Sequence, residues 1–308
     1  MQEHQAQIET ALTNLPEFAS GQAQITSLTR LGGLTNLVYR VDASDQKLIV
    51  RIPGEGTESY IDRKVELHNA WVAARTGISA EILWADGETG VMISRLIEPA
   101  ETMTPALFKS RSGSAARAGV AMRALHTAPE PFEFRFELFA MIDDYLAMLR
   151  EKNATLPEGY NEIVAAAAPV KEALANNPAA LAPCHCDPLC ENFLDDGDRM
   201  WIIDWEYSGM NDPMWDLGDL SVEAGFSPAQ DMEMLTAYLG HIPTAAQHGR
   251  MVIYKAMCDL LWTLWGLIQH AERNPAEDFW AYATGRFERC KALMGSPGFS
   301  GHLRAISG

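Results

Sequence analysis

Cysteine and basic residues are scarce in this sequence. Its five cysteines are odd in number, and most of them cluster between residues 184 and 190. Such a set argues against a disulfide framework and for buried thiols in a reducing compartment, so we expect a cytoplasmic protein. Lysine and arginine together number 24 against 41 aspartate and glutamate residues, which gives a net charge of -17. That balance argues against binding to nucleic acid or to an anionic membrane surface, because both require basic patches.

Signal and membrane segments are also missing. Residues 1–15 are polar and amphipathic, and they lack the basic start and apolar core of a signal peptide. We find no apolar stretch of membrane-spanning length and expect no membrane insertion. The 308 residues are 47% hydrophobic and 21% charged, which is enough for a sizeable globular core.

The order of predicted elements divides the chain into two lobes. Alternating apolar residues and turn signals predict strands at 37–41, 47–52, 81–85 and 91–96. Between the two pairs, an apolar stripe at positions 67, 70, 71 and 74 predicts one helix that ends near Gly77. After about Glu98, helices are predicted at 115–126, 137–150, 159–176, 229–239 and 248–272. We therefore expect an α+β fold with a β-rich lobe at 1–96, a helical lobe at 97–308 and a cleft between them.

One short segment of the helical part carries a spacing suited to phosphoryl transfer. It reads His-Cys-Asp-Pro-Leu-Cys-Glu-Asn at 185–192, and a predicted hairpin then ends at Asp204. Phosphoryl transfer needs a carboxylate that deprotonates the attacking hydroxyl, and oxygen ligands that hold Mg²⁺. Asp187 can be that base, and Asn192 and Asp204 can be the ligands. Each residue alone is more simply interpreted as a turn or helix cap, but three at this spacing behind a β-rich lobe favour a kinase.

The same segment leaves a metal–thiolate site as an alternative. Cys184, His185, Cys186 and Cys190 have the chemistry of soft metal ligands. However, structural zinc sites combine two ligand pairs, and no second pair is found elsewhere in the sequence. Buried thiols are the simpler interpretation.

A loop with two glycines lies between the first predicted strands. It reads Leu-Gly-Gly-Leu-Thr-Asn at 31–36, and paired glycines let backbone amides approach phosphate oxygens. The loop is neither a Walker A motif nor a Rossmann fingerprint, and Gly-Gly between strands is more often an ordinary turn. Arg51, on the next predicted strand, can bridge two phosphate oxygens, although alone it is equally a surface residue.

Taken together, these segments resemble the choline/ethanolamine kinase branch of the aminoglycoside-phosphotransferase-like kinases. HCDPLCENFL at 185–194 and WIIDWEY at 201–207 are similar to the branch's HNDLLCENF and IDxEY, and the glycine loop and Arg51 strand match GG(L/M)(S/T)N and (L/V)xR(L/I)xG. Cys186 and Pro188 depart from the pattern. We expect both to be tolerated, because these positions contribute mainly backbone shape. The resemblance implies a two-lobed protein-kinase-like fold with ATP and Mg²⁺ as cofactors. In overall length and in Arg-Ile-Pro-Gly-Glu-Gly-Thr at 51–57, the sequence resembles the bacterial lipopolysaccharide-modifying choline kinases.

The resemblance also implies roles for residues on the nucleotide side. The residues expected to bind the nucleotide are Gly32, Gly33, Leu34, Thr35, Asn36 and Arg51. Glu66 is the expected ion partner of Arg51, and both would act with Asp187 as catalytic residues. The backbone of residues 95–98 would meet the adenine edge, and Asp216 would brace the catalytic loop.

On the acceptor side, the resemblance implies that Glu223 faces the nitrogen of choline. Glu206 and Tyr282 are assigned to the same acceptor group. Trp262 and Trp265 lie three residues apart on a predicted helix, so they share a face and can hold a quaternary ammonium by cation–π contacts. Packing in the core is the alternative for these tryptophans, and for Trp280 the two interpretations stay equal.

We therefore expect an ATP:choline phosphotransferase whose substrate is a small cationic amino alcohol. A kinase of another alcohol (ethanolamine, an aminoglycoside or a thiamine-like compound) is the nearest alternative. A catalytically silent nucleotide-binding module is a second one. A homodimer, the pathway of the product and regulation stay open.

Overall fold

A computed structural model describes residues 2–32, 36–44, 46–54 and 61–307. In this part of the chain the amino-terminal third forms an antiparallel sheet with the strand order β1-β2-β3-β5-β4. The strands are β1 (Ile25–Arg30), β2 (Asn36–Ala43), β3 (Gln46–Pro53), β4 (Ile82–Ala85) and β5 (Met92–Arg95). The four predicted strands are confirmed. The edge strand β1 has no predicted counterpart, because its burial does not alternate residue by residue.

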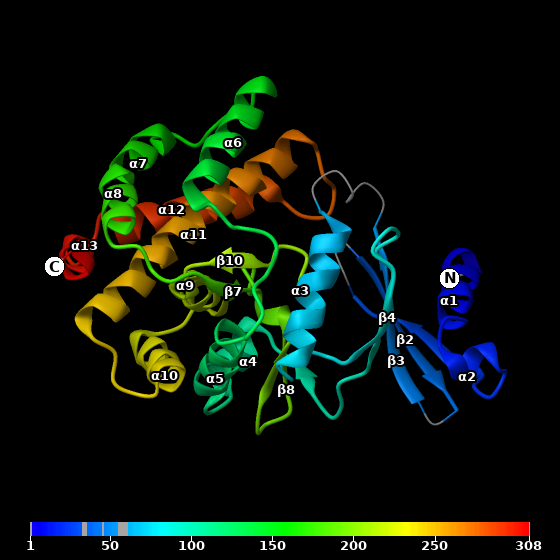
Figure 1. Cartoon of the computed structure of the whole chain (residues 1–308). Helices are drawn as coiled ribbons and strands as arrows, with labels where there is room; N and C mark the ends of the chain where they lie inside the picture. Colours follow the sequence, from blue (N-terminus) through cyan, green and yellow to red (C-terminus); the bar gives the residue numbers. More distant parts are fainter. Residues whose placement is uncertain (1, 33–35, 45, 55–60, 308) are drawn as a thin grey trace.

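Two amino-terminal helices, α1 (Gln2–Leu12) and α2 (Pro16–Ala19), lie beside the sheet (Figure 1). Successive side chains of a strand point to opposite faces, so alternate residues of β2 and β3 are buried. The buried residues form one core with α1; its members include Ile8, Leu12, Tyr39, Val41, Leu48 and Val50. Arg51 has the opposite orientation on β3 and therefore points away from this core.

The helix between the strand pairs, α3 (Arg63–Arg75), is attached to the helical lobe. It begins at Asp62, whose carboxylate accepts from two backbone amides, and it ends before Gly77, whose φ is +77°. Its buried alanines and Val72 belong to the core of the large lobe, not to the core of the sheet. The Asn69 side chain donates to the backbone oxygen of Ser208 at 2.9 Å, which ties the helix to that lobe.

The rest of the described chain is mostly helical, as predicted (Figure 1). The helices are α4 (Pro105–Ser110), α5 (Ser114–His126), α6 (Leu138–Glu151), α7 (Tyr160–Ala166), α8 (Ala168–Asn176), α9 (Pro213–Ala224), α10 (Pro228–Leu239), α11 (Ala245–Ala271), α12 (Phe279–Met294) and α13 (Phe299–Ser307). The prediction of one helix at 159–176 is wrong. Pro169 lacks the amide that an uninterrupted helix needs, so α7 ends and α8 begins just before it.

Two small sheets carry the segment with the phosphoryl-transfer spacing. β7 (Ala182–Cys184) pairs with β10 (Gly209–Asn211), and β6 (Glu101–Thr102) pairs with β8 (Phe193–Asp195), which pairs with β9 (Met200–Ile202). The predicted hairpin is therefore confirmed as β8 and β9. The two-lobed α+β organisation agrees with the prediction, and the boundary at residue 96 stays a prediction.

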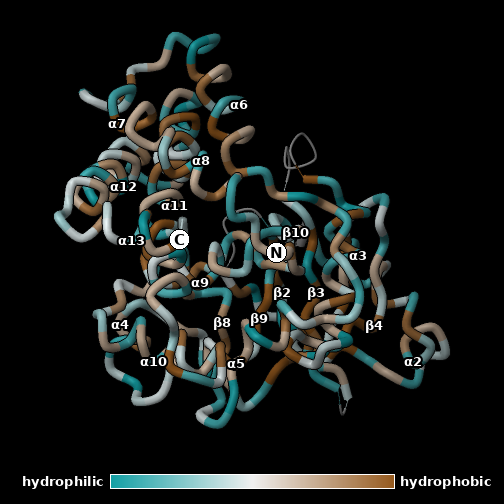
Figure 2. Tube along the Cα trace, turned by 60° about the vertical axis from the view of Figure 1, so that its left-hand side comes forward, coloured by the Kyte–Doolittle hydropathy of each residue, from teal (hydrophilic) through white to brown (hydrophobic). Residues whose placement is uncertain are grey.

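By length and composition, α11 could cross a membrane. The expectation that no apolar stretch reaches that length is therefore wrong for this segment. In the structure, 89% of its apolar window is buried inside the protein, because other helices of the large lobe surround it. A helix buried on all sides needs an apolar surface all round, so α11 is a core helix. Figure 2 shows polar segments concentrated at the outer turns.

Candidate active site

The catalytic loop, residues 185–192, is held from below by Asp216 in the first turn of α9. One oxygen of Asp216 accepts from the backbone amide of His185 at 2.7 Å, and the other accepts from the amide of Cys186 at 2.9 Å. Asp216 is fully buried, so these bonds to a charged acceptor are worth more than ordinary ones. This arrangement agrees with the expected bracing role of Asp216.

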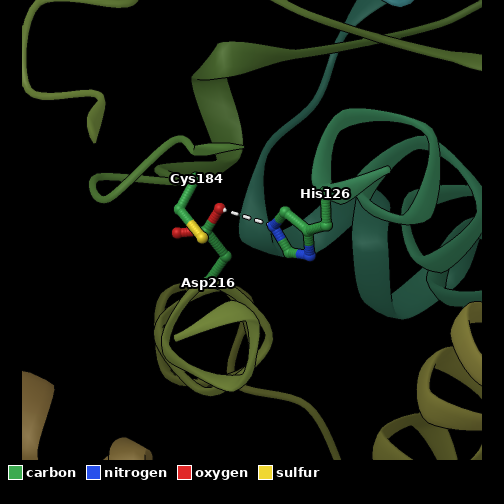
Figure 3. Close-up of side chains that lie close together, drawn as sticks. All are labelled: His126, Cys184 and Asp216. Carbon is green, nitrogen blue, oxygen red and sulfur yellow. Dashed lines mark hydrogen bonds and ion pairs between the residues drawn. The ribbon is translucent and has the colours of Figure 1, made fainter. Parts of the chain in front are cut away.

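His126, Cys184 and Asp216 form a buried cluster beside this loop (Figure 3). The Nε2 atom of His126 lies 3.0 Å from an oxygen of Asp216, and its Nδ1 atom lies 3.0 Å from the hydroxyl of Tyr238. Burial raises the pKa of Cys184 well above its usual value, so the sulfur stays a thiol. Because Asp216 already accepts from two backbone amides, we interpret the cluster as a structural brace and not as a metal centre.

The predicted soft-ligand set does not assemble around one point. His185 is engaged with the backbone oxygen of Ile203 at 2.9 Å. Cys186 and Cys190 do not join the His126 cluster or any other candidate metal group in the described residues. Burial raises the pKa of Cys186 as well, which agrees with the interpretation as buried thiols.

Asp187 lies in the middle of the loop with its carboxyl partly buried. Burial, followed by the nearby charges of Asp219, Glu223 and Asp204, raises the pKa of Asp187 well above its usual range. A carboxylate with a raised pKa is a stronger base for an alcohol proton. Asn192 donates its side-chain amide to the backbone oxygen of Asp187 at 3.1 Å, which leaves the Oδ1 atom of Asn192 as an acceptor directed elsewhere.

Asp204 follows β9 and has a strained backbone. Its φ is +69°, and that of Cys186 is +67°, in a region that non-glycine residues rarely occupy. Such strain persists only where the surroundings impose it, and it concentrates at functional sites. The hydrogen bond from His185 to the backbone oxygen of Ile203 fixes the residue just before Asp204.

The Oδ1 atom of Asp204 is buried without a hydrogen bond and lies 3.6 Å from the Nη1 atom of Arg51. Carboxylate oxygens of Glu66, Asp204 and Glu206 lie within 4.8 Å of one another. These hard oxygen donors, together with the Oδ1 of Asn192, are of the type that Mg²⁺ prefers. The side chains present therefore fit a divalent cation of this kind.

Arg51 forms the predicted ion pair with Glu66. Glu66 also accepts from Arg63 at 2.8 Å, so one carboxylate holds two guanidinium groups. The Nε and Nη2 atoms of Arg51 are buried without hydrogen-bond partners. A buried donor without a hydrogen-bond partner costs free energy, so such donors are rare in folded proteins. Their presence here is expected of a site that receives an anionic oxygen.

The glycine loop lies only partly within the described residues. Gly32 is exposed, whereas Gly33, Leu34 and Thr35 fall outside the described part of the chain. The side chain of Asn36 donates to Glu206 at 3.0 Å. Glu206, predicted to contact the acceptor, thus lies beside a residue of the nucleotide side, and its acceptor role stays a prediction.

The segment expected to meet adenine borders a cavity of about 550 Å³. Leu96 and Ile97 form one wall, and Trp71 and Trp201 form others. Neither Arg51 nor a residue of the catalytic loop lines this space, so the cavity is separate from the phosphate-side residues. The adenine contact of residues 95–98 stays a prediction.

Aromatic side chains from α11 and α12 gather near Glu223. Trp265 contacts Trp262, Phe279 and Tyr282, with ring centroids 6.5, 5.6 and 5.7 Å apart. A side chain at Gly266 would lie 2.6 Å from the ring of Tyr282, so the glycine permits this close approach of α12 to α11. Trp262 is only 4% exposed and is also part of the core, whereas Trp265 is half-buried. Both the core and the acceptor interpretations therefore apply to this pair.

Trp280, for which the core and acceptor interpretations were equal, packs against His270 with ring centroids 5.4 Å apart. Among the ring contacts of the described residues, it does not touch Trp262, Trp265 or Tyr282. Phe279, its neighbour, joins that aromatic group instead. The helical phase of α12 decides this, because adjacent residues on a helix face different directions.

Sequence reasoning missed a buried arginine in this group. Arg286 forms ion pairs with Glu223 and, at 3.3 Å, with Asp259. Its guanidinium lies 4.6 Å from the ring centroid of Tyr282. Glu223, predicted to face a substrate cation, therefore already has a basic partner. Position 286 is one helical turn after position 282, and that spacing is the signal that could have revealed the contact of Arg286 with Tyr282.

Comparison with known proteins identifies the family of this chain. Residues 27–248 match the family described as the phosphotransferase enzyme family, APH. Protein LicA of Haemophilus influenzae is 29% identical over 270 residues, which cover 86% of this chain and 78% of that protein. A crystal structure of LicA in complex with AMP is 27% identical, with a TM-score of 0.72 over 94% of this chain and 97% of that one.

A more similar solved structure is a choline/ethanolamine kinase family protein from Mesorhizobium loti. It is 57% identical, with a TM-score of 0.89, and the match covers 98% of both chains. The kinase-like fold, nucleotide binding and an alcohol acceptor follow from membership of this group. The chain belongs to the phosphotransferase enzyme family and, within it, to the choline/ethanolamine kinase family.

Proposed function

We propose that this protein is an ATP:choline phosphotransferase that transfers the γ-phosphate of ATP to the hydroxyl of choline. The observation that carries the proposal is the assembly of Asp187, Asn192 and Asp204 next to Arg51, with an aromatic and carboxylate group on the acceptor side. The names of its relatives support a choline or ethanolamine acceptor.

In this proposal Asp187 accepts the proton of the attacking hydroxyl. Its raised pKa suits that task, and its backbone is fixed by the loop that Asp216 braces. The positive charge of Arg51 stabilises the negative charge of the phosphate groups. Its Nε and Nη2 atoms, which have no hydrogen-bond partner in the protein, donate to the phosphate oxygens in this proposal. Glu66 keeps Arg51 in position through their ion pair.

Asn192 and Asp204 are the residues proposed to hold Mg²⁺. When bound, the ion supplies charge neutralisation at the phosphate oxygens. The buried Oδ1 atom of Asp204, which has no hydrogen bond, supports this assignment. Removal of divalent ions with a chelator should therefore abolish turnover.

The acceptor preference rests on the chemistry of the aromatic group. A quaternary ammonium donates no N–H hydrogen bond, so aromatic faces and carboxylates must hold it. Trp265 offers a partly exposed indole for this purpose, and Glu223 lies nearby with its partner Arg286. Ethanolamine, in contrast, has N–H donors and would gain more from carboxylates than from indole faces.

A coupled assay of ADP formation tests the proposal. Purified protein with ATP and Mg²⁺ should turn over choline at a higher kcat/KM than ethanolamine or an aminoglycoside. A higher kcat/KM for one of the other alcohols would identify that alcohol, and not choline, as the acceptor. Bound ATP without ADP formation on any of them would instead identify a silent nucleotide-binding module.

Glu66→Gln is expected to raise the KM for ATP about tenfold. The substitution keeps the size of the side chain but removes the charge that holds Arg51 and Arg63. Steady-state kinetics at saturating acceptor measure the effect. Glu88→Gln is the matched control, since it breaks an exposed ion pair with Lys64 that contributes little. An unchanged KM in Glu66→Gln would show that Arg51 does not depend on its partner.

Trp265→Ala is expected to raise the KM for choline about tenfold and that for ethanolamine much less, because cation–π contacts contribute about 0.5–2 kcal/mol each. The measured quantity is the ratio of kcat/KM for the two alcohols. Trp280→Ala is the control, since Trp280 packs against His270 and should leave the ratio unchanged. Equal losses on both alcohols would contradict recognition by the indole face.

A further inference from the structure

The carboxylates near the aromatic group of Trp262, Trp265 and Tyr282 differ in their basic partners. Glu223 pairs with Arg286, and Asp259 pairs with Arg286 and, at 2.6 Å, with Arg289. Asp219 forms no ion pair with a lysine or arginine anywhere in the described residues. It is therefore a buried acid whose charge has no direct counter-ion, at 1% exposure.

The two oxygens of Asp219 accept from neutral donors on α11. The indole nitrogen of Trp262 donates at 3.1 Å, and the sulfur of Cys258 donates at 3.1 Å. These hydrogen bonds require α9 and α11 to approach closely. Gly218 permits that approach, because a side chain at this position would lie only 2.9 Å from the backbone oxygen of Met251. Asp219 thus holds an indole that belongs to the aromatic group.

Asp219 and Glu223 lie four residues apart on α9 and so share one face of the helix. Trp262, which Asp219 holds, contacts Trp265 and Tyr207, with ring centroids 6.5 and 6.2 Å apart. A cation in this group would therefore lie near two carboxylates. Glu223 is neutralised by its direct ion pair with Arg286, whereas Arg286 forms no ion pair with Asp219 and acts on it only at longer range.

We propose that Asp219 fixes the Trp262 indole and supplies the unpaired negative charge that draws the cationic head of the acceptor into the pocket. This inference rests on the proposed function, because it takes the substrate to be a cationic alcohol. Asp219 acts as a positioning and affinity residue and does not touch the reacting hydroxyl.

The charge of Asp219 depends on pH near neutrality. Burial and then the neighbouring charge of Glu223 raise the pKa of Asp219 to about 8. A cation nearby favours the ionised carboxylate, so binding of the cation and loss of the proton promote each other. The proton leaves to the buffer. Affinity for a cationic acceptor therefore increases as pH rises through this range.

Other titratable groups near Asp219 are Glu223 on α9, Cys258 on α11, Arg286 and Tyr282 on α12, and Cys186 and Asp187 in the catalytic loop. Burial raises the pKa of Cys258 well above its usual value, and Glu223 raises that of Arg286 despite its burial, so neither changes charge at moderate pH. Asp187, whose pKa burial also raises, is the competing titrating group. An experiment must separate the two acids.

The test measures the Kd for choline by calorimetry between pH 6.5 and 9. The expected affinity of the unmodified protein rises about tenfold across this range. Choline keeps its charge at every pH, so the titrating group must belong to the protein. The control ligand is 3,3-dimethyl-1-butanol, which has the shape of choline without the charge, and its affinity should not change.

Asp219→Asn should weaken choline binding at pH 9 about tenfold and flatten the pH profile. Asp187→Asn should keep the rise with pH. Trp262→Phe removes one donor to Asp219, so the midpoint should move to higher pH. An unchanged affinity for AMP shows that each variant is folded. If Asp219→Asn does not fold, Trp262→Phe provides the test.

A rise with pH that survives in Asp219→Asn, or that disappears in Asp187→Asn, would overturn this inference and leave the proposed function standing. An unmoved midpoint in Trp262→Phe would overturn it in the same way. Failure of choline to bind at any pH would overturn both the inference and the proposed function.

Discussion

Replacing Asp187 with asparagine is expected to lower kcat about a thousandfold, because a positioned general base contributes about 10²–10⁴ in rate. The amide keeps the shape of the side chain but cannot accept the hydroxyl proton. Asp187 makes no ion pair in the described residues, so its loss should leave the loop intact. Nucleotide affinity, measured by calorimetry with AMP, should change less than about threefold.

Glu191→Gln is the matched control for Asp187→Asn. It makes the same chemical change in the same loop, but Glu191 is exposed to solvent. We expect its kcat to equal that of the unmodified protein. A kcat for Asp187→Asn within tenfold of normal would show that a different group removes the proton.

The second large effect is expected for Asp216→Asn, in both stability and turnover. One amide oxygen can replace a carboxylate oxygen, but the NH₂ group would face a backbone N–H that has lost its acceptor. Breaking a buried charged contact of this kind costs about 3 kcal/mol, which lowers Tm by about 5 °C in a chain of this length. We also expect kcat to fall about a hundredfold, because Asp187 loses its fixed orientation.

Asp231→Asn separates the two consequences. Asp231 is also a buried aspartate with an ion pair, to Lys255 at 2.7 Å, but its partners, Lys255 on α11 and Ser221 on α9, do not belong to the catalytic loop. This variant should lose stability and keep kcat. If Asp216→Asn likewise kept its kcat while melting earlier, Asp216 would be a core residue without influence on the loop.

The residues of the catalytic loop could be predicted from sequence because chemistry fixes their spacing over a short stretch. The hairpin that brings Asp204 back is local, and the pair between Arg51 and Glu66 follows from one strand and the next helix. The brace from Asp216 was predicted only through the family resemblance. Local geometry alone does not bring residue 216 to residue 185.

Side-chain contacts that depend on how two helices cross could not be predicted from the sequence. Asp219 meets Trp262, and Arg286 meets Glu223, only because α9, α11 and α12 pack together closely. Nothing in the spacing of one helix determines which face of another it contacts. The break before Pro169 is a different case, since the sequence contained its signal and the apolar pattern on both sides concealed it.

The attachment of α3 to the large lobe bears on how the enzyme can be controlled. In protein kinases the equivalent helix sets activity by moving its glutamate toward or away from the basic residue of the sheet. Here Ile202 donates its amide to Ile78 at 2.7 Å, Trp205 donates to Ser79 at 3.0 Å, and Asn69 is bonded on both sides of its amide. A helix anchored in this way cannot swing outward without dismantling the lobe. We therefore expect an enzyme that is always switched on, whose output follows the concentrations of its two substrates.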